Sequence, residues 1–300
     1  MRFIIIGGGV AGVTAALDLA KKEAGDIHIF TDEEYPYYYR PQLTEFMAGT
    51  LPLNKLLRRP LSWFTDRGIE VSLGRRVTAI HPETKMISLG NGDQEPYDQL
   101  LIATGSMPFI PPIKGVDKKS VKTWRTLEDT LELEKAALTC QDVVIIGGGL
   151  LGLEAARGLK GFCGKITVLE FFPRLLPRQL DIEGAGLLQK FVESLGIEVM
   201  VGAKTEEILG DEFANGVRLQ DGQVINCQTI LLAAGVRCNA TIAEKAGITV
   251  DRGVVVNDFM ETSIPSIYAA GDVAVYKGYS WAIAPIAQAQ ARIAVANILG

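Results

Sequence analysis

The sequence predicts an α/β protein built from two similar three-layer domains, each containing a parallel sheet. The main observation is a glycine-rich segment that occurs twice, at residues 7–12 (Gly-Gly-Gly-Val-Ala-Gly) and 147–152 (Gly-Gly-Gly-Leu-Leu-Gly). A short apolar run precedes each copy, and an alanine-rich stretch with helical periodicity follows it. A strand, a tight turn and a helix in this order open a βαβ unit. The chain is therefore expected to contain two such units.

The Gly-x-Gly-x-x-Gly spacing gives each glycine a separate role. The first allows the turn out of the strand, the second lets a phosphate approach the backbone, and the third lets the helix pack on the strand. Free N–H groups and the helix dipole favour an anion at the start of the helix. Each copy is therefore expected to bind the pyrophosphate of a dinucleotide. The residues expected there are Gly7, Gly9, Val10, Ala11 and Gly12 in the first copy, and Gly147, Gly149, Leu150, Leu151 and Gly152 in the second.

In the first half, the elements after the glycine-rich turn continue the βαβ pattern. Residues 26–30 are expected to form the second parallel strand. Residues 70–73, 76–80 and 86–89 alternate in polarity and predict an inserted β-meander. Residues 100–105 predict a buried strand that ends in glycine.

The second half repeats this order. Thr126 and the acid three residues later resemble a capping box that opens a helix. Strands are expected at residues 165–169 and 198–201 on either side of a helix at residues 182–195, and a hairpin turns at residues 220–223.

The last sixty residues differ in character and are expected to return to the first domain. Residues 253–257 and 267–272 predict strands, and residues 283–299 predict an alanine-rich helix. The proline-rich segment at residues 108–112 predicts a linker. The expected domains are residues 1–110 with 240–300, and residues 111–239.

Length and composition fit two ordinary domains and exclude several function classes. The 300 residues are 48% hydrophobic, and typical domains have about 100–150 residues. A net charge of −5 without a basic tail argues against a nucleic-acid partner. No apolar run approaches the roughly 20 residues that cross a bilayer, and no signal peptide precedes the first strand. A cytoplasmic protein without a membrane partner is expected.

The cysteines and histidines indicate neither a metal site nor acyl transfer. The four cysteines form no Cys-x-x-Cys pair, so neither a redox disulfide nor a zinc site is encoded locally, and inert thiols are expected. No serine or cysteine nucleophile is indicated near His28 or His81.

Five motifs in order carry a resemblance over nearly the whole chain: residues 7–12, 103–106, 147–154, 234–237 and 268–272. Together they resemble the two-dinucleotide flavoprotein family of pyridine nucleotide oxidoreductases. Residues 37–43, Ala48-Gly49 and residues 63–70 are most similar to NADH:rubredoxin reductases and to the flavin portion of related nitrite reductases and NADH oxidases.

The resemblance implies FAD on the first copy and NADH on the second, with a hydride passing from NADH to FAD. A departure is Thr31 at the end of the second strand, where an acid is usual, so that Glu33 or Asp32 must reach the adenosine ribose of FAD. The remaining implied FAD contacts are Arg40, Pro41, Val77, Ala103, Thr104, Gly105, Gly271, Asp272 and Ile286. The remaining implied NADH contacts are Glu154, Glu170 and Gly235.

Glu170 stands at the end of its strand, where a carboxylate can accept bonds from both ribose hydroxyls. The phosphate of NADPH would lie beside this charge, and two unit charges about 4 Å apart cost about 4 kcal/mol at an effective dielectric near 20. NADH is therefore the expected cofactor, although Arg174 is close enough in sequence to reduce the discrimination.

Glu154 matches the family glutamate that faces the flavin and nicotinamide, with a plain helix-face glutamate as the alternative. Its usual lysine partner is replaced by Glu45. The cysteines that relay electrons in related disulfide reductases and peroxidases have no counterpart here, so electrons are expected to leave the flavin directly.

The expected acceptor is a rubredoxin or another small iron–sulfur protein, which the basic residues Lys55, Arg58 and Arg59 would attract unless they are only a solvated face. Molecular oxygen, a role as the FAD portion of a nitrite reductase, and a flavin-loaded redox sensor stay open as alternatives. The C-terminal interface domain of relatives is expected to be absent.

Overall fold

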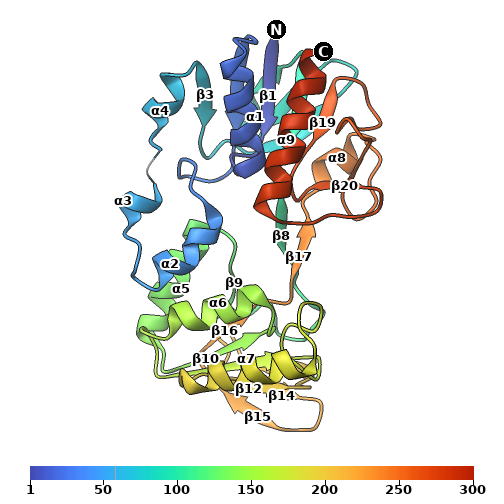
Figure 1. Cartoon of the computed structure of the whole chain (residues 1–300). Helices are drawn as coiled ribbons and strands as arrows, with labels where there is room; N and C mark the ends of the chain where they lie inside the picture. Colours follow the sequence, from blue (N-terminus) through green and yellow to red (C-terminus); the bar gives the residue numbers. More distant parts are fainter. Residues whose placement is uncertain (58) are drawn as a thin grey trace. The chain divides into compact units, whose positions relative to one another are not determined.

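The computed structural model describes residues 1–57 and 59–300, and the chain divides into two compact units (Figure 1). Unit 1 consists of Met1–Tyr39, Leu57–Met107 and Arg237–Gly300, and unit 2 of Arg40–Leu56 and Pro108–Val236. Residues 40–56 thus pack with the second unit, whereas the sequence-based bounds assign them to the first. Among the described residues, no helix is both long and apolar enough to cross a membrane.

Unit 1 contains a five-stranded parallel sheet in the order β19-β7-β1-β2-β3. Its central strand is almost wholly buried, as expected when both faces of a parallel sheet are covered. The C-terminal segment supplies β19, which pairs with β7. The strands are β1 (Arg2–Ile6), β2 (Asp26–Phe30), β3 (Ile69–Ser72), β7 (Gln99–Ile102) and β19 (Ile267–Ala269).

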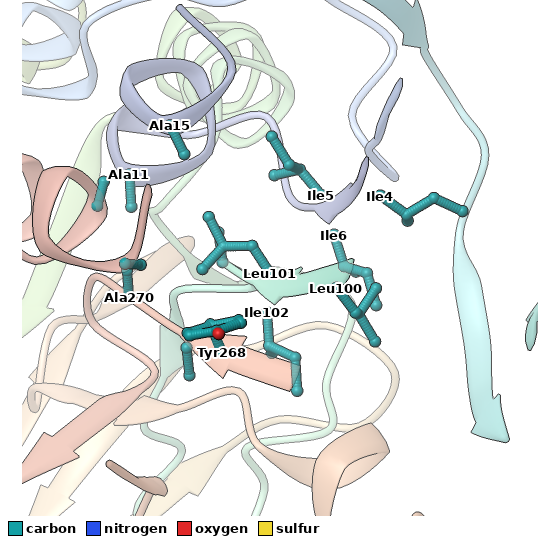
Figure 2. Packing of buried hydrophobic residues seen from close by; sticks show 14 of the residues in the cluster. Ile4, Ile5, Ile6, Ala11, Ala15, Leu100, Leu101, Ile102, Tyr268 and Ala270 are labelled. Carbon is teal, nitrogen blue, oxygen red and sulfur yellow. The ribbon is translucent and has the colours of Figure 1, made fainter. Parts of the chain in front are cut away.

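Small side chains let two helices of unit 1 pack closely together, α1 (Val10–Lys21) and α9 (Ala284–Leu299). Figure 2 shows Ala15 of α1 on the side of the sheet to which Ile5 of β1 and Leu101 of β7 point, with Ala11 near Ala270. The other elements of unit 1 are α4 (Leu61–Thr65), α8 (Thr241–Lys245), and the paired strands β18 (Val254–Val256) and β20 (Ala274–Tyr276).

The meander expected in unit 1 is partly wrong. It comprises β4 (Val77–His81), β5 (Met86–Leu89) and β6 (Gln94–Pro96), which are antiparallel. Residues 70–73 do not belong to it, because β3 (Ile69–Ser72) pairs in parallel with β2 at the edge of the main sheet. In β3, Ile69 is buried and the next residue, Glu70, is exposed, so the strand shows the same alternating polarity as a meander strand.

Unit 2 repeats the plan with a parallel sheet in the order β12-β11-β10-β16-β9 and a separate three-stranded antiparallel sheet, β13-β14-β15. The strands are β9 (Val121–Thr123), β10 (Asp142–Ile146), β11 (Lys165–Glu170), β12 (Glu198–Val201), β13 (Thr205–Leu209), β14 (Gly216–Leu219), β15 (Val224–Asn226) and β16 (Thr229–Leu232). Two short strands, β8 (Ser106–Pro108) and β17 (Val236–Cys238), pair with each other.

Three helices of unit 2, α5, α6 and α7, begin where the sequence predicts. The capping box of Thr126 and Asp129 opens α5 (Leu127–Thr139) and is confirmed, and the Asp181 side chain caps α7 (Ile182–Ser194). The remaining helices are α6 (Leu150–Leu159), α2 (Leu43–Met47), α3 (Leu53–Leu56) and the 3₁₀ helix η1 (Arg40–Gln42). Two parallel sheets, each with its own antiparallel meander, confirm the expected fold class.

Candidate functional site

The glycine-rich turn of unit 1 leaves no room for side chains at its first and third glycines. Gly7 has φ +116°, and a Cβ added there would lie 2.2 Å from the carbonyl oxygen of Ala103 on the neighbouring strand. A Cβ on Gly12 would lie 2.0 Å from the carbonyl oxygen of Gly7. The Gly7 N–H donates to the carbonyl of Phe30 over 2.8 Å, which ties the turn to β2.

The turn of unit 2 has nearly the same geometry. Gly147 has φ +125°, and an added Cβ would lie 2.3 Å from the carbonyl oxygen of Ala233. At Gly152 the Cβ would lie 2.0 Å from the carbonyl oxygen of Gly147. The Gly147 N–H donates to the carbonyl of Leu169 over 2.8 Å. The two turns are therefore two instances of one backbone structure.

Both turns present free backbone N–H groups at the start of a helix. Gly9 is the N-cap of α1 and Gly149 the N-cap of α6, and neither helix has a capping side chain among the described residues. A Cβ added to either glycine would meet nothing within 4 Å, so the backbone is open on that side. Open backbone and an uncapped helix start together fit a bound phosphate group.

In unit 1, three loops meet at the carboxyl ends of the parallel strands. Ala103 lies against Gly7, and a Cβ on Gly271 would lie 3.0 Å from that of Ala11, so the turns after β1, β7 and β19 lie together. Thr104 donates its hydroxyl to the carbonyl of Asn239 over 2.7 Å. The carboxyl end of the strands is where open α/β sheets bind their ligands.

Two polar residues that were not among the predicted cofactor contacts hold the loop after β19. Ser106 donates its hydroxyl to the Asp272 carboxylate over 2.8 Å. The Gly271 N–H donates to the side-chain oxygen of Gln290 over 2.9 Å, and Gln290 is buried on α9. A sequence signal for Gln290 exists, because it lies on the buried stripe of α9 with Ala287 and Ala291. Ser106 is the last residue of the motif at residues 103–106, which marks this segment but does not indicate its contact with Asp272.

The end of β2 carries the residues expected at the adenosine ribose of FAD. Thr31 is buried, and its side chain lies against Gly8, so it supports the turn. Glu33 accepts a hydrogen bond from the hydroxyl of Tyr38, while Asp32 is exposed.

The predicted FAD residues are divided between the two units. Arg40 and Pro41 lie in η1, which belongs to unit 2. The others lie in unit 1: Gly7, Gly9, Val10, Ala11, Gly12, Asp32, Glu33, Val77, Ala103, Thr104, Gly105, Gly271, Asp272 and Ile286. All the predicted NADH residues lie in unit 2, and their roles, like those in unit 1, stay predictions.

At the end of β11, Glu170 replaces the threonine found at the same point in unit 1. Its side chain is only 6% exposed. One carboxylate oxygen accepts the Gly148 N–H over 2.7 Å, and the other accepts the Phe172 N–H over 2.8 Å. Arg174 donates instead to the carbonyls of Pro177 and Leu180 in its own loop. Glu170 is therefore fixed against the glycine-rich turn, and Arg174 is engaged elsewhere.

Glu154 lies on α6 within reach of α2. The Thr44 hydroxyl donates to its carboxylate over 3.4 Å. Met47 of α2 packs against Gly158 of α6, where an added Cβ would lie 2.9 Å from the methionine sulfur. Burial raises the pKa of the Glu154 carboxyl, and the Thr44 hydroxyl partly offsets this. Thr44, rather than the neighbouring Glu45, is thus the contact of Glu154 on α2.

The four cysteines are free thiols, and burial favours the protonated form of three of them. Burial raises the pKa of Cys163 to about 11 and that of Cys227 to about 12. Burial also raises the pKa of Cys238. Because the thiolate is the reactive form, these groups are poor nucleophiles at neutral pH. The described residues contain no group of three or more acidic, histidine or cysteine side chains that would hold a metal ion.

Comparison with known proteins agrees with this geometry. A family model described as "Pyridine nucleotide-disulphide oxidoreductase" matches residues 1–291. A nitrite reductase [NAD(P)H] of Bacillus subtilis is 36% identical over 100% of this chain and 37% of its own length. An NADH oxidase of Methanocaldococcus jannaschii is 35% identical over 91% of this chain and 63% of its own length.

Other relatives are matched over a larger share of their length. An NADH-rubredoxin oxidoreductase of Clostridium acetobutylicum is 31% identical over 100% of this chain and 75% of its own length. The reductase in a covalent putidaredoxin reductase–putidaredoxin complex superposes with a TM-score of 0.92 at 26% identity, over 99% of this chain and 75% of that one. The chain thus spans well under half of the nitrite reductase and about three quarters of the rubredoxin and putidaredoxin reductases.

Proposed function

The chain belongs to the pyridine nucleotide-disulphide oxidoreductase family, and on this premise we propose that it binds FAD in unit 1 and NADH in unit 2. It would transfer a hydride from NADH to FAD and pass the electrons to an external acceptor without a protein disulfide. The observation that carries the proposal is the repeated turn of Gly7 and Gly147, which gives one chain two helix starts of the same backbone geometry, each able to accept a phosphate.

The FAD assignment rests on the residues that converge in unit 1. Gly9 and the open start of α1 would bind the pyrophosphate, and Glu33 would accept bonds from the adenosine ribose. Asp272, oriented by Ser106, would accept a hydrogen bond from the sugar-like part of the cofactor. When bound, FAD supplies hydride acceptance and stepwise release of electrons; the protein supplies position and electrostatics.

The NADH assignment rests on unit 2. The start of α6 at Gly149 would bind the pyrophosphate, and the fixed carboxylate of Glu170 would disfavour the extra phosphate of NADPH. The engagement of Arg174 by Pro177 and Leu180 supports this preference, because that guanidinium is not directed to a phosphate. Thr44 would hold the Glu154 carboxyl in place.

The positions and the raised pKa values of the cysteines support direct electron transfer from the flavin to the acceptor. No cysteine lies within residues 10–47, which contain α1 and α2 and where disulfide and sulfenate relays of the family would need one, and the thiols of Cys163 and Cys227 resist ionisation. The protein would therefore act as an NADH:acceptor oxidoreductase despite the disulphide in the family name.

The proposed acceptor is a rubredoxin or a similar small iron–sulfur protein. Relatives named for rubredoxin and putidaredoxin support this choice. The basic cluster considered for docking is only partly described: Arg58 lies outside the described residues. Lys55 is exposed in unit 2, and Arg59 in unit 1 lies 4.8 Å from the ring centroid of Trp63.

Oxygen is the second candidate acceptor, favoured by the NADH oxidase relative. Anaerobic stopped-flow mixing of the FAD-loaded protein with NADH separates the candidates. Flavin bleaching in milliseconds, followed by rapid reoxidation with rubredoxin, supports the proposal. Fast bleaching that only oxygen reverses identifies an oxidase. Slow bleaching with a persistent long-wavelength band identifies a redox sensor, and protein that does not bind FAD refutes the proposal.

A further inference from the structure

Two aromatic side chains directly follow Glu170 and remain exposed. Phe171 is 57% exposed and Phe172 49% exposed, and their rings meet edge to face with centroids 5.4 Å apart. Large aromatic side chains normally bury most of their surface in a core or at a binding site. A pair left open beside the expected ribose ligand therefore suggests a binding role.

The backbone holds this pair in a fixed position. The Phe172 N–H donates to the Glu170 carboxylate over 2.8 Å, and the Phe172 carbonyl accepts the Gly202 N–H over 2.8 Å. The same carboxylate accepts the Gly148 N–H, so Phe171 is attached to the glycine-rich turn through its neighbour. The backbone that carries the Phe171 ring is consequently held next to the glycine-rich turn, which reduces the freedom that this segment loses when a ligand binds.

The exposed ring of Phe171 suits a flat aromatic ligand. The ammonium of Lys204 lies 5.8 Å from the ring centroid. In a Rossmann-like unit the acid after the second strand binds the adenosine ribose, so the adenine extends just beyond it. An aromatic ring at that point can stack on a purine, as aromatic side chains do on the bases of nucleic acids.

We propose that Phe171 is the platform on which the adenine ring of the nicotinamide nucleotide stacks. The proposal rests on the NADH site assigned above and adds a residue that recognises adenine. Unit 1 lacks this feature, because Asp32 occupies the position equivalent to Phe171. The two similar turns would thus differ in how they recognise the adenosine part of their ligands.

Phe213 provides a matched control in the same unit. It is 56% exposed, and the ammonium of Lys119 lies 5.7 Å from its ring centroid, so its exposure and cation contact nearly equal those of Phe171. It lies between β13 and β14 rather than after Glu170. Removing either ring should affect stability similarly, whereas only Phe171 should affect adenine binding.

The test compares the FAD-loaded wild type with Phe171→Ala, Phe171→Trp and Phe213→Ala. Dissociation constants are measured by calorimetry for ADP-ribose, which contains adenine but no nicotinamide, and for reduced nicotinamide mononucleotide, which contains the opposite half. Loss of stacking in Phe171→Ala should weaken ADP-ribose binding about tenfold, or about 1.4 kcal/mol. Binding of the mononucleotide, FAD content and melting temperature should not change, and Phe171→Trp should restore ADP-ribose binding.

The outcomes separate this proposal from the proposed function. If wild type binds neither NADH nor ADP-ribose, the NADH site itself is refuted. If wild type binds both and Phe171→Ala binds ADP-ribose equally well, only the adenine platform is refuted. An equal loss in Phe213→Ala, or an equal loss of the mononucleotide in Phe171→Ala, also refutes it.

Discussion

Replacing Glu170 with glutamine tests whether this carboxylate organises the glycine-rich turn of unit 2 as well as selecting NADH. The wild-type group is 6% exposed and accepts two backbone N–H bonds, from Gly148 and Phe172. Glutamine has one carbonyl oxygen, so its amide nitrogen must face one of these two donors. The variant keeps the shape of the side chain and removes one acceptor and the charge.

The magnitude follows from the lost bond. Leaving one buried N–H without an acceptor costs about 1–3 kcal/mol, and the surviving bond weakens because its acceptor is no longer charged. Glu170→Gln should therefore lower the free energy of unfolding by about 1–3 kcal/mol. It should also weaken NADH binding while the ratio of NADPH to NADH affinity rises, because the charge opposing the extra phosphate is gone.

Hydrogen exchange of the Gly148 amide and calorimetric binding of both nucleotides provide the assay. Glu198→Gln is the control, since Glu198 is a carboxylate on the adjacent strand whose side chain is 47% exposed and paired with Lys165. Removal of an exposed pair costs at most about 1 kcal/mol. Wild-type protection of the Gly148 amide and unchanged NADH affinity in Glu170→Gln would refute the reasoning.

Three further predictions concern other groups. Gly152→Ala should abolish NADH binding but retain FAD, and Gly12→Ala should abolish FAD binding but retain NADH, because each new Cβ would lie 2.0 Å from a backbone oxygen. Absorbance measures the FAD content, and calorimetry measures NADH binding. Burial lowers the pKa of His28 below 6.5, so the stability that its neutral form contributes is present above pH 6.5 and is lost as the pH falls below that value. The melting temperature of wild type should therefore fall more between pH 7.5 and pH 5.5 than that of His28→Phe, which has no group to protonate. Thr44→Val removes the hydrogen bond that lowers the pKa of Glu154, so this pKa should rise. The pH midpoint of flavin reduction by NADH should then move upward, and an unchanged midpoint would exclude Glu154 from that step.

The sequence was sufficient for the fold because its strongest signals are local. The turns at Gly7 and Gly147 and the capping box at Thr126 each depend on residues a few positions apart, and all three form as predicted. The meander was only partly predictable, since the pairing of β3 with β2 is set by a contact between distant segments. Alternating polarity does not distinguish the two arrangements.

The candidate site shows the same division. The spacing of glycines around Gly9 and Gly149 predicted two open helix starts, which the structure contains. The contact of Thr44 with Glu154 was not predictable, because it joins residues 110 positions apart through the packing of α2 on α6. The hydrogen bonds from the Gly148 and Phe172 N–H groups to Glu170 were not predictable either. A motif indicates which ligand a carboxylate suits, but not which backbone groups it binds in the folded chain.

The contribution of β19 to the sheet of unit 1 has a consequence for the order of biogenesis. All the segments of unit 2 have been translated once Val236 is made, whereas unit 1 must wait for Ile267–Ala269 and for Gln290 to complete its sheet edge and the loop at Gly271. Because domains generally fold as units during synthesis, unit 2 should become protease-resistant on ribosomes stalled at shorter chain lengths than those at which unit 1 does. The strands of the first hundred residues therefore stay without their edge partner β19 until residues 267–269 have been made.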